Sequence, residues 1–129
     1  LDWIFYEYYI KSSNQLIENK MLVEAFRLMI RNMEKDREFL LKASRSDQGS
    51  LYDVMFRSFR DAIQKVLQSM EVDLQAVNPL FTEKLVAEYY ANSITFVVTK
   101  WMEMEMSIPS DDVVELFQKL TLPVIEQFL

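Results

Sequence analysis

Residues 79–106, with the sequence PLFTEKLVAEYYANSITFVVTKWMEMEM, predict one long helix that is apolar on two sides. A surface helix needs a single apolar stripe, so a helix with two must be covered on two sides. One face meets the core of its own chain, and the other is expected to meet a partner; the alternative is a central helix in a monomeric bundle. The first face carries Tyr90, Ile94, Val97, Trp101 and Met104, the second carries Leu85, Tyr89 and Phe96, and a narrow polar strip carries Lys84, Glu88, Asn92, Thr95 and Thr99.

The segment that follows predicts a second helix of the same kind. Pro109-Ser110-Asp111-Asp112 is a helix start with Ser110 as N-cap, and Pro123 should kink the helix near Leu120. Its apolar row is Val113, Phe117, Leu120, Val124 and Phe128. Residues 79–129 therefore form the expected dimerisation helices, half of a four-helix interface between two copies. The predicted interface residues are Tyr90, Ile94, Val97, Trp101, Val113, Phe117 and Leu120.

Helical periodicity also dominates upstream, and strand alternation is nearly missing. We expect helices over 1–19, 21–34 and 50–72, with a break and a short helix after residue 34. Ser44–Ser50, which holds Gly49, predicts a loop, and Asn78-Pro79 predicts the start of the long helix. The expected fold class is all-α, about six helices in an antiparallel bundle, with residues 1–129 as a single domain.

The composition argues against catalysis. The chain has no Cys and no His, which removes thiol nucleophiles, imidazole bases and nearly every zinc site. Gly49 is the one glycine, so neither a phosphate-binding loop nor a dinucleotide fingerprint is present. The neighbouring acids Asp111 and Asp112 fit a helix start, while Glu103 and Glu105 point to different sides of their helix. We expect neither an enzyme, a cofactor nor a metal site.

The charge is unevenly distributed. Residues 1–70 hold 10 acids and 11 bases, whereas residues 71–129 hold 10 acids and 3 bases. An acidic half repels phosphate, so the chain by itself is a poor nucleic-acid binder. The longest uncharged stretch in the most apolar region, Tyr89 to Thr99, is too short to span a bilayer, and no signal peptide is visible. We therefore expect no membrane contact, and the lack of Cys fits a reducing, cytoplasmic setting.

The chain is rich in flexible and aromatic side chains, with eight Met, nine Phe, six Tyr and two Trp. Such side chains can form the wall of a pocket for varied apolar ligands. They also serve as ordinary core residues at helical spacing. The sequence alone leaves both interpretations open.

Three stretches in the second half of the chain carry a resemblance to a known family. They are Ala87–Ile94 (AEYYANSI), Lys100–Glu103 (KWME) and Ile108–Asp112 (IPSDD). These stretches are similar to the C-terminal region of TetR-type transcriptional regulators of the branch common in Gram-positive bacteria. Asn32–Leu40 (NMEKDREFL) also resembles that branch, and the likeness covers roughly residues 20–120. Asn92-Ser93 stands where paired glycines are common. Glu103–Met106 replaces a glycine-containing turn, so the long helix is expected to extend further.

The resemblance implies an effector-binding and dimerising domain that follows an N-terminal helix-turn-helix. The chain opens at Leu1 already in a helical pattern, so we expect a fragment in which the DNA-binding head is missing and residues 1–19 are the linking helix. Effector binding would move that helix and change the spacing of the two heads on DNA. The expected partners are a second copy, a small apolar or aromatic effector, and DNA only through the missing head. The inward residues proposed for the pocket are Tyr6, Tyr9, Phe26, Met29, Met33, Met55, Phe59 and Tyr89.

The alternative function is a stand-alone helical co-regulator that acts by pairing with a partner and has no DNA-binding domain. The upstream sequence separates the two hypotheses. A basic helix-turn-helix of about 50 residues before Leu1 would support the regulator, and a start codon directly before Leu1 would exclude it.

Overall fold

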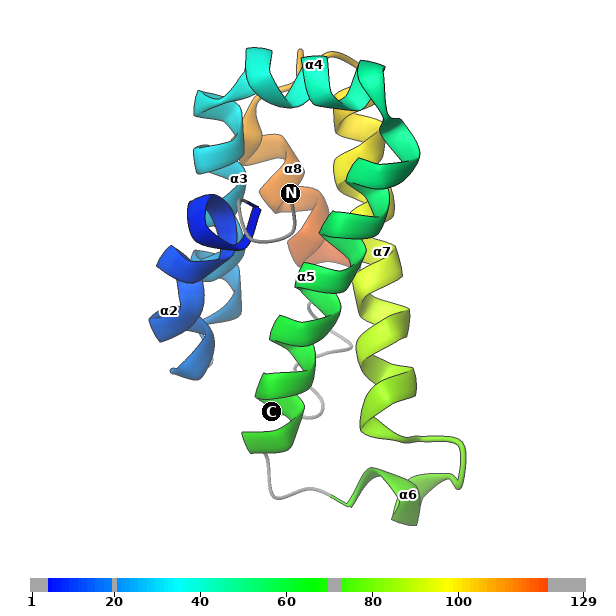
Figure 1. Ribbon diagram of the computed structural model, residues 1–129. Helices are drawn as coiled ribbons and strands as arrows, with labels where there is room; N and C mark the ends of the chain where they lie inside the picture. Colours follow the sequence, from blue (N-terminus) through cyan, green and yellow to red (C-terminus); the bar gives the residue numbers. More distant parts are fainter. Residues whose placement is uncertain (1–4, 20, 70–72, 121–129) are drawn as a thin grey trace.

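The computed structural model describes residues 5–19, 21–69 and 73–120, and these residues form helices and turns without a strand (Figure 1). The all-α prediction is confirmed. Helices α5 (Gln48–Ser69) and α7 (Glu83–Glu103) run antiparallel, side by side, as the longest pair. Helix α3 (Leu22–Lys35) packs on α8 (Ser110–Leu120), α4 (Arg37–Ser46) crosses one end of the bundle between α3 and α5, and the short α6 (Leu74–Val77) lies at the other end.

The N-terminal segment is less regular than the single helix expected over 1–19. It consists of a π-helical turn η1 (Tyr6–Ile10), a 3-10 turn η2 (Lys11–Ser13) and the short helix α2 (Asn14–Glu18). This segment packs on α3 and α5. The buried side chains of Phe5, Tyr9 and Ile10 hold it there, because they join the same apolar cluster as α3 and α5.

The predicted loop over Ser44–Ser50 is wrong. Helix α4 continues to Ser46, and α5 begins at Gln48. Asp47 separates them, and its Oδ1 accepts a hydrogen bond from the Ser50 backbone N–H at 3.0 Å. The polar cluster is therefore a helix cap, and Gly49 lies in the first turn of α5.

Both ends of α7 differ from the prediction. The helix begins after Thr82, whose Oγ1 accepts from the Leu85 N–H at 3.1 Å, while Asn78 closes a turn by accepting from the Leu80 N–H at 2.9 Å. The helix ends at Glu103 rather than extending to Met106. Glu105 and Met106 adopt left-handed backbone conformations, with φ of 57° and 53°, in a turn that contains no glycine.

Ser110, predicted as the N-cap, is the first residue of α8, and the cap comes from another helix. The Glu34 carboxylate of α3 accepts from the Ser110 backbone N–H at 2.9 Å and from the Ser110 hydroxyl at 3.2 Å. Trp101 supports the preceding turn by donating its indole N–H to the Ile108 carbonyl at 2.8 Å. The kink predicted at Pro123, and the buried positions predicted at Val124 and Phe128, lie outside the described residues.

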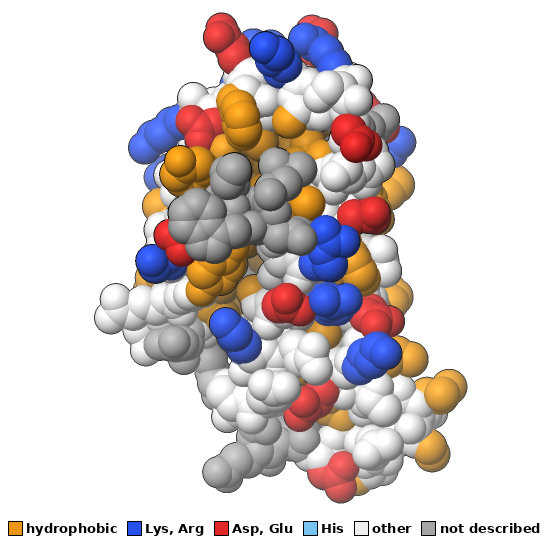
Figure 2. Space-filling view, viewed as in Figure 1, with side chains coloured by type: hydrophobic (Ala, Val, Ile, Leu, Met, Phe, Trp, Pro, Cys, Tyr) orange, Lys and Arg blue, Asp and Glu red, His pale blue; other side chains and the backbone are white. Residues whose placement is uncertain are grey.

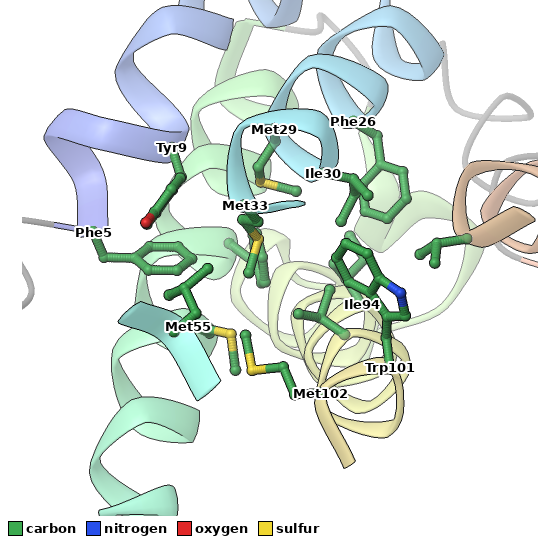
Figure 3. Packing of buried hydrophobic residues seen from close by; sticks show 14 of the residues in the cluster. Phe5, Tyr9, Phe26, Met29, Ile30, Met33, Met55, Ile94, Trp101 and Met102 are labelled. Atoms are coloured by element: carbon green, nitrogen blue, oxygen red, sulfur yellow. The ribbon is translucent and has the colours of Figure 1, made fainter. Parts of the chain in front are cut away.

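The main core lies where α3, α4, α5, α7 and α8 meet the N-terminal segment. Figure 3 shows Phe5 and Tyr9 on one side of it, Met33, Met55 and Met102 in the middle, and Ile94 and Trp101 on the other side. A second, smaller cluster continues between α5, α6 and α7. The buried methionines thus fill the centre of the bundle, which is the ordinary role of a methionine stripe at helical spacing.

Candidate functional site

A cavity of about 90 Å³ lies between the main core and the smaller cluster. Its wall comes from five parts of the chain: the N-terminal segment, α3, α5, α7 and α8. The surface of the cavity is almost entirely apolar, and the cavity is partly open to solvent. The wall residues are Ile10, Ser13, Ile17, Leu22, Ala25, Phe26, Met29, Phe59, Ala62, Ile63, Val66, Leu67, Val86, Tyr90, Ile94 and Phe117.

Small side chains explain why space remains here. Ser13, Ala25 and Ala62 face the cavity from three different elements, and none of them reaches across to fill it. The Ser13 hydroxyl is buried and donates to the Ala25 carbonyl at 3.2 Å, so its proton is not available to a ligand. An apolar void of this kind forfeits the dispersion contacts that its lining atoms would otherwise make. An apolar molecule can recover those contacts.

Only part of the predicted pocket set lines this cavity. Phe26, Met29 and Phe59 lie in its wall. Tyr9, Met33 and Met55 are buried in the main core and are not among the cavity residues. Tyr6 is half-buried beside α5, outside the wall. Tyr89 is 65% exposed and lies outside the cavity wall, which corrects its assignment to the pocket.

The sequence reasoning favoured long Met and aromatic side chains, whereas the cavity is lined mostly by aliphatic and small ones. Three lining residues, Tyr90, Ile94 and Phe117, had been assigned to the dimer interface. The other lining residues that the sequence did not predict are Ile10, Ser13, Ile17, Leu22, Ala25, Ala62, Ile63, Val66, Leu67 and Val86. The signal that could have found them is the occurrence of Ser13, Ala25 and Ala62 on inward helix faces. Large side chains close a space, and small ones leave it open.

The predicted interface residues need a similar correction. Tyr90, Ile94, Trp101, Val113 and Phe117 are buried within the chain itself, so they do not form an outer face. Tyr90, Ile94 and Phe117 line the cavity, and the Phe117 ring stacks on Phe26 with centroids 4.1 Å apart. Val97 is partly buried, and Leu120, which was expected to be buried, is 65% exposed. Within the described chain, the residues proposed for a partner thus belong mostly to the core.

The second apolar face of α7 is the exposed one. Leu85, Tyr89 and Phe96 are all between 42% and 65% exposed, and Figure 2 shows hydrophobic side chains along the outer edge of the molecule over α7. Thr95, expected in the polar strip, is instead completely buried, and its hydroxyl donates to the Ala91 carbonyl at 2.6 Å. The helix is therefore two-faced as predicted, with the inner and outer faces exchanged.

Polar contacts attach the N-terminal segment to the rest of the chain. The buried Tyr9 donates its hydroxyl to Asp36 Oδ2 at 2.8 Å, at the junction of α3 and α4. Burial, and then the bond to Asp36 and its negative charge, raise the pKa of Tyr9. Burial likewise raises the pKa of Tyr90. Asn14 donates to the Tyr6 hydroxyl at 2.8 Å, and the Lys65 ammonium of α5 lies 5.9 Å from the centre of the Tyr6 ring.

Residues 5–19, 21–69 and 73–120 show neither a metal site nor a membrane-spanning helix. These residues contain no group of three or more acidic side chains that could hold a metal ion. They also contain no helix that is both long and apolar enough to cross a membrane. The apolar cavity is therefore the feature of the described residues with the clearest capacity to bind a ligand.

Comparison with known proteins identifies the family. A family model described as the C-terminal region of transcriptional regulators, of the TetR type, matches residues 20–122. No curated protein and no solved structure matches the chain significantly. The matched range begins just before α3 and ends just after α8, so it contains every helix from α3 to α8. Since the match covers most of the sequence, the chain belongs to the family of TetR-type transcriptional regulator C-terminal regions.

Proposed function

We propose that this chain is the effector-binding and dimerisation domain of a TetR-type transcriptional regulator, and that its effector binds in the apolar cavity. The observation that carries the proposal is the cavity itself, because the parts of its wall that α3, α5, α7 and α8 contribute lie within the family-matched region. A largely apolar, partly enclosed space between helices is the usual form of a small-molecule site in a helical bundle.

The N-terminal segment supplies a route from the cavity to the rest of the regulator. Ile10, Ser13 and Ile17 of this segment form one side of the cavity, and the segment precedes the family-matched region. A ligand that pushes on these side chains favours one position of the segment over another. Binding then shifts the population between two conformations. In the whole regulator, a DNA-binding head that precedes this segment would move with it.

Dimerisation is proposed for the outer face of α7. Leu85, Tyr89 and Phe96 form an exposed apolar row on it, and α8 adds the exposed Leu116 and Leu120. An exposed apolar row of this length marks an association site on a protein that is otherwise well packed. The proposed occupant is the same face of a second copy, related by a two-fold axis. This assignment replaces the buried residues named from the sequence.

The experiment that tests the binding site compares the natural chain with two cavity-filling variants. Ala62→Leu on α5 and Ala25→Leu on α3 each add apolar atoms to the cavity from a different side. Both variants should remain folded, because there is room for the added atoms. In a thermal-shift screen of apolar and aromatic compounds, ligands that stabilise the natural chain should stabilise both variants much less.

The opposite result is equally informative. If the compounds that stabilise the natural chain stabilise both filled variants to the same extent, they bind elsewhere and the proposed site is wrong. If no apolar compound stabilises the natural chain, the effector-binding function is contradicted as well.

A further inference from the structure

The chemistry of the cavity restricts the part of a ligand that can enter it. Among the lining residues that the structure describes, Ser13 and Tyr90 alone have polar side chains, and the Ser13 hydroxyl already donates to the Ala25 carbonyl. A hydroxyl, amide or charge buried here would lose its bonds to water and find almost nothing to replace them. The buried part of the ligand must therefore be hydrocarbon.

The shape of the cavity favours a chain over a broad ring system. On α5 the wall extends from Phe59 to Leu67, and on the antiparallel α7 it extends from Val86 to Ile94. At 1.5 Å per residue, each of these stretches is about 12 Å long. The two stretches run along the same direction, so the apolar lining is elongated. A flexible aliphatic chain follows an elongated apolar lining better than a rigid polycyclic molecule does.

A positive charge lies at the seam between the N-terminal segment and α5. Lys65 follows the wall residues Ala62 and Ile63 on α5, and its ammonium lies 5.9 Å from the ring of Tyr6, one helical turn before the wall residue Ile10. Within the described part of the chain, no carboxylate is paired with Lys65. Asp61, one turn earlier on α5, is bound by the Arg60 Nε at 3.2 Å.

We propose that the ligand is a single-chain anionic amphiphile, of which a fatty acid is the simplest form. Its aliphatic chain lies between α5 and α7, and its anionic head remains in water beside Lys65, within reach of the Asn14 amide at Tyr6. This inference rests on the proposed function, because it names the chemical class of the effector. It explains why the described wall is almost entirely apolar while Lys65, which pairs with no carboxylate among the described residues, lies beside it.

The first test varies the length of the chain. Hexanoic, octanoic and decanoic acids are titrated below their micelle concentrations by isothermal calorimetry against the natural chain. Each additional buried methylene should tighten binding about fourfold, and the gain should stop once the chain is longer than the cavity. Ala62→Leu shortens the available space, so the same series should reach its plateau at a shorter acid.

The second test varies the head group and Lys65. Decanoate should bind about two- to fivefold more tightly than decanol, because an exposed charge pair contributes modestly. In Lys65→Gln this advantage should disappear, while the affinity for decanol stays the same. Lys42→Gln, which removes an exposed lysine of α4 at the other end of the bundle, should keep the preference for decanoate.

The outcomes separate the two proposals. If naphthalene or indole binds and Ala62→Leu blocks it, while decanoate does not bind, the ligand class is wrong and the effector-binding cavity stands. If decanol and decanoate bind equally to the natural chain, the role of Lys65 is wrong. If none of these probes binds, both proposals are overturned.

Discussion

At the scale of single residues, Tyr9 holds the irregular N-terminal segment to the bundle. Its side chain is 1% exposed, and its hydroxyl donates to the carboxylate of Asp36, which is itself exposed. A hydrogen bond to a charged acceptor stabilises more than one between neutral groups. Tyr9 was predicted as a pocket residue, and its position in the structure gives it a structural role instead.

We predict that Tyr9→Phe lowers the free energy of unfolding by about 1 kcal/mol at neutral pH, because the Asp36 carboxylate can return to water when the hydroxyl is removed. The pH dependence is a sharper test. Above about pH 10 an unfolded tyrosine loses its proton, whereas the raised pKa keeps Tyr9 protonated in the folded chain. Stability should therefore fall as the pH rises, by up to about 1.4 kcal/mol per pH unit for this group.

Urea unfolding of both proteins between about pH 8 and pH 11 measures this effect. Tyr90, whose pKa is also raised by burial, remains in both proteins and contributes equally to each. The difference between the natural chain and Tyr9→Phe should therefore shrink above pH 10. A difference that stays constant across this range would show that Tyr9 has the same pKa in the folded and unfolded chain.

Two residues show where residue-scale reasoning from the sequence reaches its limit. Glu105 and Met106 adopt left-handed conformations that glycine adopts more easily, and the sequence therefore indicated a longer helix. Tertiary contacts select the turn instead. The Glu105 carbonyl accepts from Arg37 Nε at 2.9 Å, its carboxylate pairs with Arg45, and the Met106 side chain is buried. None of these partners is close to the turn in sequence.

At the scale of elements, the contact between α3 and α8 depends on one carboxylate more than on the visible ion pair. Glu34 of α3 accepts two hydrogen bonds from Ser110, which is buried at the start of α8. Arg31 and Asp111 join the same two helices at 3.3 Å, but both side chains are more than half exposed. Water screens the second pair, whereas the first satisfies a helix N-terminus that is shielded from water.

Glu34→Ala should therefore lower the free energy of unfolding by about 1–2 kcal/mol, as the loss of a helix cap does. Arg31→Ala, one turn earlier on the same helix, is the matched control and should change it by less than about 0.5 kcal/mol. Thermal unfolding of the two variants measures both values. Equal effects would mean that the capping contact contributes no more than the exposed ion pair.

The helices were the most predictable part of the molecule, because the spacing of apolar residues that predicts a helix lies within that helix's own stretch of sequence. The ranges expected for α3 and α5 agree with the structure to within a few residues, and the two-faced character of α7 is present. The sequence did not show which face of α7 packs against the core. Ala87 and Ala91 lie on the inner face and are completely buried, so small side chains, rather than the most hydrophobic ones, mark where α5 packs closely.

At the scale of the whole molecule, the outer face of α7 is the surface through which we propose that two copies associate. Its apolar row runs from Leu85 to Phe96, which is about 17 Å along the helix axis. We predict that the natural chain sediments as a dimer and that Phe96→Asp, at a position 58% exposed, yields a folded monomer. A buried aspartate without a partner would oppose association, while the exposed position keeps the monomer stable.

Phe39→Asp on α4 is the matched control, because Phe39 is 52% exposed on a different surface. It should remain a dimer in analytical ultracentrifugation, and circular dichroism should show unchanged helicity in both variants. A natural chain that stays monomeric at tens of micromolar would contradict the dimer proposal. Dissociation of both variants to the same extent would show that the interface is not confined to α7.

The wall of the cavity joins the two ends of the described chain. Ile10 comes from the N-terminal segment and Phe117 from α8, so both helical ends must be in place for the cavity to exist. Local opening of either end would release a bound molecule, and a bound molecule must in turn oppose that opening. Amide hydrogen exchange with solvent deuterium should consequently slow in α8 when the cavity is filled. It should stay the same in α4, which contributes no residue to the wall.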